Sequence, residues 1–141
     1  MITEEKRVAL VRWSASLRGQ PFSWGWNDCN MLVARAMDII LDTNDFTALL
    51  FAEYDDEATA VQFHASLHFT LEDVVAGAGA VAISPGFEQT GDILIQPDSC
   101  GQIQMQAGMV YVSDRAICAI PGKGILYVPP RMIQNYRLWR F

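Results

Sequence analysis

The segment that most constrains this chain is residues 21–33, which join a loop rich in aromatic and polar residues to the start of an apolar helix. It reads PFSWGWNDCNMLV, and the apolar residues that follow keep helical spacing as far as Ile40. Asn27 or Asp28 is suited to cap this helix, because their side-chain oxygens accept hydrogen bonds from its first N–H groups. Cys29 therefore falls in the first helical turn.

A cysteine at this place has two interpretations. The positive end of a helix favours the thiolate and lowers the pKa of a thiol, which is how many nucleophilic cysteines are positioned while a base comes from elsewhere in the chain. Small cysteines are also common in protein cores, so a buried and inert Cys29 is the alternative. The segment alone leaves both interpretations open.

The length of 141 residues fits a single domain over residues 1–141, and a hydrophobic content of 51% is enough for a core. No apolar run reaches 18 residues, and the charged N-terminus lacks the apolar stretch of a signal peptide, so we expect no membrane span and synthesis for the cytoplasm. Cys29, Cys100 and Cys118 make an odd count without metal-site spacing. We therefore expect neither a disulfide framework nor a metal site, and no cofactor.

The charge is unevenly distributed along the chain. A net charge of −6 argues against nucleic-acid binding. Residues 38–114 contain 13 acidic residues and no Lys or Arg, whereas residues 115–141 contain five basic residues and no acidic ones. A solvated acidic face would account for this division. Docking between charge-complementary neighbours in an assembly is the other interpretation.

Spacing and capping residues predict helices in the first half of the chain and strands in the second. The expected helices follow Thr3, cover 29–41 and 57–67, and run from a capping box at 70–73 to Gly77, with a short turn within 46–51. The expected strands cover 92–95, 105–112, 116–120, 125–128 and 136–141, and 77–85 is expected to be a connector. Helices followed by antiparallel strands predict an α+β fold.

The segment 21–33 resembles the nucleophile motif of NlpC-like cell-wall peptidases, in which aromatic-x-Trp-Gly precedes Asp-Cys-Ser-Gly-Leu-Val. Phe22, Trp24, Gly25 and Asp28-Cys29 match this motif, and Leu32-Val33 also match, while Asn30-Met31 replace Ser-Gly. A second part of the chain resembles the strands of the same family. Gly91-Asp92 match its Gly-Asp strand, Gln106-Ala107-Gly108 match its His-x-Gly strand, and Cys118 lies 12 positions after Gln106, before a Pro-Gly-Lys-Gly turn.

The resemblance implies a papain-like α+β fold in which N-terminal helices pack on a small antiparallel sheet or half-barrel. It implies that Cys29 has the nucleophile position and that Phe22, Trp24 and Asp28 lie in the cleft. Many family members carry a Tyr where this chain has Phe22, and the hydroxyl of that Tyr helps at the oxyanion.

The same resemblance implies that the catalyst is lost. Gln106 occupies the position of the base, and an amide does not accept and return a proton near neutral pH. Cys118 occupies the position of the polar third residue of the triad, so Gln106 and Cys118 are expected to lie on neighbouring strands and to face Cys29. His64 and His68 have the i, i+4 spacing of a metal pair but lack a third ligand, so we interpret them as structural or surface residues. The family places their helical region away from the strand of Gln106, so neither is expected to replace the base.

The glycine-rich insertion usual between the two halves of the family motif is missing, and this shortened form resembles a phage tail-associated branch. We therefore expect a non-catalytic structural or assembly component of a bacteriophage tail, at the tip or baseplate. It would belong to the virion, be assembled in the host cytoplasm, and contact other tail or baseplate proteins in a symmetric multi-subunit assembly. The alternatives are an active cysteine hydrolase that cleaves peptidoglycan peptides and a module that binds a cell-wall peptide without cutting it.

Overall fold

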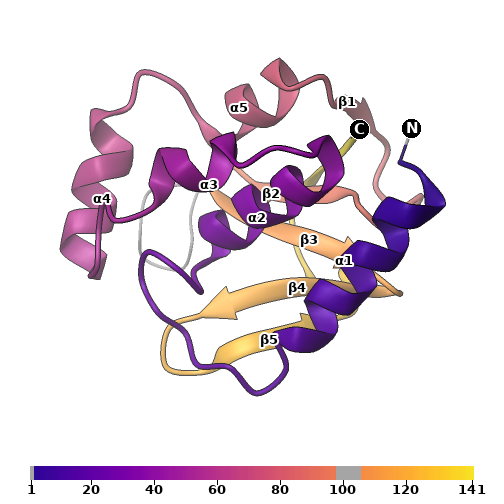
Figure 1. The fold of residues 1–141 in the computed structure, drawn as a ribbon, viewed down its shortest axis with the longest axis horizontal. Helices are drawn as coiled ribbons and strands as arrows, with labels where there is room; N and C mark the ends of the chain where they lie inside the picture. The colour runs from indigo at the N-terminus through magenta and orange to yellow at the C-terminus, as the bar shows by residue number, and fades with distance from the viewer. Residues whose placement is uncertain (1, 98–105) are drawn as a thin grey trace.

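The computed structural model describes residues 2–97 and 106–141, and these form an α+β fold in which the α-helices come first and the strands follow them (Figure 1). The helices are α1 (Glu4–Ser16), α2 (Cys29–Leu41), α3 (Asp45–Leu50), α4 (Glu57–Ser66) and α5 (Leu71–Gly77), with a 3-10 turn η1 (Pro130–Met132). The strands are β1 (Val81–Ile83), β2 (Ile93–Gln96), β3 (Ala107–Val112), β4 (Arg115–Ile120), β5 (Gly124–Val128) and β6 (Arg137–Arg140).

The strands form one antiparallel sheet in the order β1-β6-β2-β3-β4-β5. The expectation that residues 77–85 are only a connector is wrong, because β1 lies there and pairs with β6 from Val81↔Arg140 to Ile83↔Leu138. Three residues are too few to display the period-2 alternation of a strand. The strand depends on pairing with the distant C-terminal segment, which local sequence does not report.

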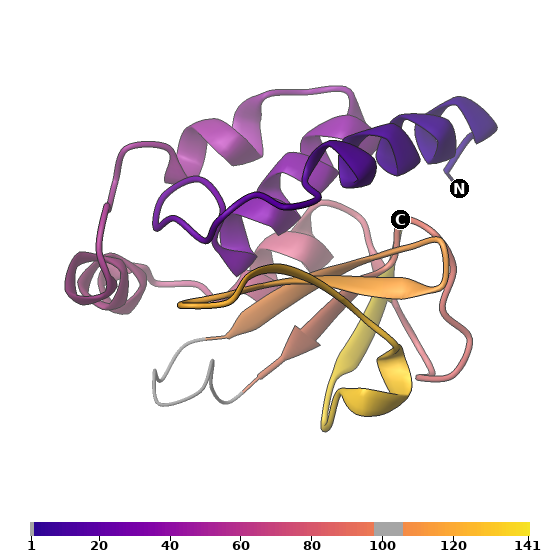
Figure 2. The same cartoon turned by 90° about the horizontal axis from the view of Figure 1, so that it is seen from below.

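The principal core lies between the helices and one face of the sheet, where α1 and α2 cross the strands (Figures 1 and 2). Its buried residues include Leu32, Val33 and Met37 of α2, together with Val110 of β3 and Ile117 of β4. The opposite face carries a smaller cluster, against which residues from the segment around η1 pack (Figure 2). Side chains alternate between these two faces along each strand.

Gly108 determines how closely α2 and α5 can pack on β3. A Cβ at this position would lie 2.5 Å from Cγ2 of Val33 and 2.7 Å from Cδ2 of Leu71. The missing side chain therefore lets α2 and α5 approach the beginning of β3, directly after Gln106. This approach places the beginning of β3 against Val33 of α2 and Leu71 of α5.

The helix caps predicted at Thr3 and Thr70 are confirmed, and of the two candidates Asn27 and Asp28 it is Asp28 that caps α2. Thr3 accepts a hydrogen bond from the backbone N–H of Lys6, and Asp28, Asp56 and Thr70 cap α2, α4 and α5 in the same way. Across residues 2–97 and 106–141, no helix has the length and apolar character that a membrane span needs.

Candidate functional site

Cys29 is the first residue of α2, as predicted, and Asp28 ties the preceding loop to the helix. One carboxylate oxygen of Asp28 accepts from the N–H of Met31 at 2.9 Å, and the other accepts from the N–H of Gly25 at 2.7 Å. Asp28 is buried, and Cys29 is only 6% exposed. The thiol therefore lies at a rigid helix N-terminus but beneath the surface.

The predicted cleft residues stand in the loop before α2. The rings of Phe22 and Trp24 meet edge to face, with their centroids 4.8 Å apart. Phe22 also packs against the principal core. Both aromatic rings therefore support the loop that carries Asp28 and Cys29.

A tyrosine from a distant segment lies at the same loop. Gly25 has φ +87°, and a Cβ there would lie 2.4 Å from the backbone carbonyl oxygen of Tyr54, which follows α3. Tyr54 is buried, and its burial together with the charge of Asp28 raises the pKa of its phenol, with a smaller contribution from Cys29. A phenol hydroxyl thus lies near Asp28 and Cys29 although Phe22 has none. Sequence reasoning missed Tyr54, because nothing near it in the chain resembles a site motif.

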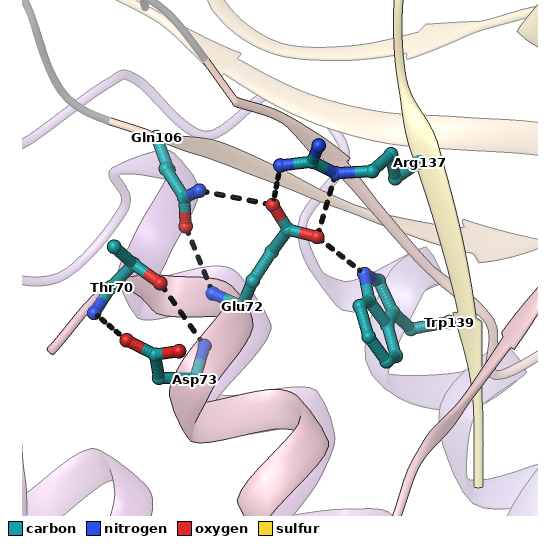
Figure 3. A network of polar contacts seen from close by, with 6 residues as sticks. All are labelled: Thr70, Glu72, Asp73, Gln106, Arg137 and Trp139. Atoms are coloured by element: carbon teal, nitrogen blue, oxygen red, sulfur yellow. Dashed lines mark hydrogen bonds and ion pairs between the residues drawn. The ribbon is translucent and has the colours of Figure 1, made fainter.

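Gln106 is held by α5 (Figure 3). Its amide nitrogen donates to Oε1 of Glu72 at 3.1 Å, and its amide oxygen accepts from the backbone N–H of Glu72 at 2.9 Å. The Glu72 carboxylate also accepts from Nε of Arg137 at 2.8 Å and from Nε1 of Trp139 at 3.1 Å. Both polar atoms of Gln106 are therefore bound by Glu72 of α5. Glu72 in turn connects α5 to β6 through Arg137 and Trp139.

Cys118 lies on the wrong face of the sheet for the predicted triad. Register pairs Val110 with Ile117, and Ile117 belongs to the core on the α2 side, whereas Cys118 packs in the cluster on the opposite face. The expectation that Cys118 faces Cys29 is therefore wrong.

The physical reason is the two-residue turn between β3 and β4. Ser113 and Asp114 both have positive φ, +50° and +68°, and this turn pairs Val112 with Arg115. A register set in this way puts positions 106 and 118 on opposite faces, since side chains alternate along each strand.

His64 lies closer to the candidate site than expected. Its Nδ1–H donates to the carbonyl of Ala60 at 2.8 Å, so Nε2 is left to accept from the amide nitrogen of Asn30 at 3.1 Å. The thiol of Cys29 donates to the amide oxygen of Asn30 at 3.7 Å. The amide of Asn30, which is 2% exposed, therefore stands between the thiol and the imidazole.

The contacts of His64 also bear on the metal alternative. Both of its ring nitrogens are engaged in hydrogen bonds, one to the backbone and one to Asn30. In the part of the chain that the structure describes, no three His, Cys, Asp or Glu side chains gather as metal ligands. His64 therefore has a structural role in holding α4 against α2.

A cavity of about 590 Å³ lies beside this site and is lined mainly by apolar side chains of α2, α3, α4 and α5. Asn30, His64 and Gln106 are among its polar lining residues, and Cys29 is not part of the described lining. A molecule in this cavity would meet the amide of Asn30 and the imidazole of His64 before the thiol. The geometry favours contact with polar groups over attack by Cys29.

Comparison with known families gives one match. Residues 3–141 match a family described as a domain of unknown function, DUF6950. No curated protein matches the chain.

Proposed function

We propose that this chain, which belongs to the DUF6950 family, is a non-catalytic structural or assembly component of a bacteriophage tail. It would be built on a degenerate NlpC-like peptidase fold and would act at the tail tip or baseplate, in contact with other tail proteins. The tail placement is supported by the two-part motif resemblance, in residues 21–33 and in the strands around Gly91 and Gln106. The α+β arrangement, with Cys29 opening a helix packed on an antiparallel sheet, is compatible with that resemblance.

The observation that carries the non-catalytic proposal is the hydrogen bonding of the Gln106 amide to Glu72. Its amide is bound at both polar atoms by Glu72 and does not accept and return a proton near neutral pH. Cys118 does not supply a third residue, because it lies on the other face of the sheet. Members of a catalytic triad act as a unit, so loss of the base alone lowers the rate by orders of magnitude.

The experiment that tests this proposal is complementation in the phage that encodes the chain. Deletion of the coding sequence should stop the production of complete tails, and the chain should be present in purified particles. A Cys29→Ala variant should restore tail production to the level of the unchanged chain, because the thiol would have no chemical task. Absence of the chain from particles, or complementation that requires Cys29, would contradict the proposal.

A cysteine hydrolase acting on peptidoglycan peptides is the second candidate, and one observation favours it. The hydrogen-bond chain from Cys29 through Asn30 to His64 puts an imidazole one side chain away from the thiol. A shift of the Asn30 amide would be needed before His64 could take the thiol proton. Under this candidate His64→Ala abolishes peptide cleavage, whereas under the proposed function neither the unchanged chain nor the variant cleaves.

A further inference from the structure

A second hollow, of about 620 Å³, lies over the outer side of the helical layer, among α1, α2, α3 and the loop before α2. We call it the aromatic groove, and its defining residues are Trp13, Trp26, Arg35, Ile39 and Phe51. Trp26 is 43% exposed and Phe51 is 58% exposed, and their rings meet edge to face with centroids 6.1 Å apart. Exposed Trp and Phe side chains that adjoin one another are typical of protein-binding surfaces.

Arg35 lies against two of the aromatic rings that line the aromatic groove, those of Trp13 and Trp26. Its guanidinium carbon lies 4.1 Å from the ring centroid of Trp26 and 5.7 Å from that of Trp13. The same guanidinium donates to the carbonyl of Trp26 at 3.2 Å and to the amide oxygen of Asn27 at 3.0 Å. These contacts hold the Trp26 ring in place before any partner arrives, which reduces the entropy lost on binding.

The surroundings of the aromatic groove are acidic. Asp45 and Glu53, at the beginning of α3 and just beyond its end, are exposed, and the side chain of Asp42 is 90% exposed. Asp42 pairs with Lys6 at 3.1 Å, and the carboxylate of Asp38, which lines the groove, accepts from two backbone N–H groups of α3. Arg35 keeps its positive charge and Lys6 adds a second, but the four carboxylates of Asp38, Asp42, Asp45 and Glu53 outnumber these two cations, so the net charge of these groups is negative.

We propose that the aromatic groove binds a segment of a neighbouring protein in which an apolar anchor is flanked by Lys or Arg. The anchor packs against the Trp26–Phe51 pair, and the basic residues face Asp45 and Glu53. This inference rests on the proposed function, since it names the surface through which an assembly component meets its neighbour. Central aromatic residues contribute most of the affinity of such contacts, while the charged rim sets orientation and association rate.

The test uses the full chain, labelled with ¹⁵N, and two synthetic peptides, Ac-GKKWLKKG-NH₂ and its acidic counterpart Ac-GEEWLEEG-NH₂. The basic peptide should shift the indole N–H signal of Trp26, identified with Trp26→Phe, and the acidic peptide should not. Phe51→Ser should weaken binding of the basic peptide at least about tenfold. Asp45→Lys combined with Glu53→Lys should weaken it too, as should added salt.

Phe87→Ser is the matched control, because Phe87 is 70% exposed but lies outside the aromatic groove. It should leave peptide binding unchanged. Equal shifts with both peptides, no shift with either, or an equal loss in Phe51→Ser and Phe87→Ser would overturn the proposal. A Trp26 signal that moves with protein concentration alone would assign the groove to a second copy of the chain and also overturn it. If complementation by Cys29→Ala succeeds and the titration fails, the groove assignment falls and the proposed function stands.

Discussion

Glu72 shows how a single residue joins distant segments of the chain. It brings together Gln106, Arg137 and Trp139, which lie far apart in the sequence, and its side chain is largely buried (Figure 3). A carboxylate that accepts from several donors in this way stabilises the packing of a helix on a sheet. Position 106 therefore contributes to the fold through Glu72.

Glu72→Gln tests this contribution. The substitution removes the charge that pairs with Arg137 and places amide hydrogens against existing donors, so the free energy of unfolding should fall by about 1–3 kcal/mol. We expect a loss of unfolding free energy near the lower end of this range, because Arg137 is exposed and solvent screens its charge. Urea unfolding measures the change, with Glu53→Gln as the exposed control, which should change stability by less than about 0.5 kcal/mol. Equal stabilities for the two variants would show that the Glu72 contacts contribute nothing.

Gly25 tests the contact between the loop before α2 and Tyr54. Gly25→Ala would combine a positive φ with a Cβ only 2.4 Å from the Tyr54 carbonyl oxygen. Gly19→Ala has a similar positive φ, +76°, with no atom within 4 Å of its Cβ, and so measures backbone strain alone. We expect Gly25→Ala to lower the thermal midpoint well beyond Gly19→Ala. If the two variants melt together, Tyr54 does not approach the loop in solution as described.

At the scale of elements, the packing of α2 and α5 on β3 depends on Gly108. Gly108→Ala should lower stability by about 1–3 kcal/mol, because its Cβ would enter the space of Val33 and Leu71. Gly77→Ala is the matched control, since nothing lies within 4 Å of a Cβ there and alanine is the better helix former. Urea unfolding should show a loss for the first variant and no loss for the second. A neutral Gly108→Ala would mean that the helices adjust without cost.

Local signals account for the elements that were predicted well. The start of α2 at Cys29 follows from the Asp28 cap and the apolar spacing after it, and the capping box at Thr70 marks α5 equally clearly. The existence of the strand pair around Ser113 and Asp114 was also predictable. Its register was not, because the pairing depends on the turn conformation of these two residues.

The candidate site was predicted only in part, for the same reason. Cys29 and Asp28 belong to one local motif, and their geometry was predicted from the sequence. Tyr54 and His64 reach the site through the packing of the segment after α3 and of α4, which no local pattern encodes. The loss of the base was predicted from Gln106 alone, whereas its engagement by Glu72 required the arrangement of α5 against β3.

At the scale of the whole molecule, the two proposals concern different places, the buried thiol at the start of α2 and the aromatic groove. The helical layer covers one face of the sheet (Figure 2), and the aromatic groove lies among α1, α2, α3 and the loop before α2. The site of Cys29 lies beneath Tyr54, Asn30 and His64, and the groove lies among acidic residues. A buried thiol and a separate aromatic groove fit the proposed role, in which the chain holds neighbouring proteins in position.

The most direct test of the central claim is a turnover assay with purified protein, peptidoglycan and model stem peptides. Under the proposed function we expect no cleavage above background by the unchanged chain, and the same result for Cys29→Ala and His64→Ala, because an amide, Gln106, would occupy the position of the base. An active NlpC-like peptidase assayed in parallel shows that the substrates are competent. Cleavage by the unchanged chain that disappears in Cys29→Ala would contradict the account and establish the hydrolase.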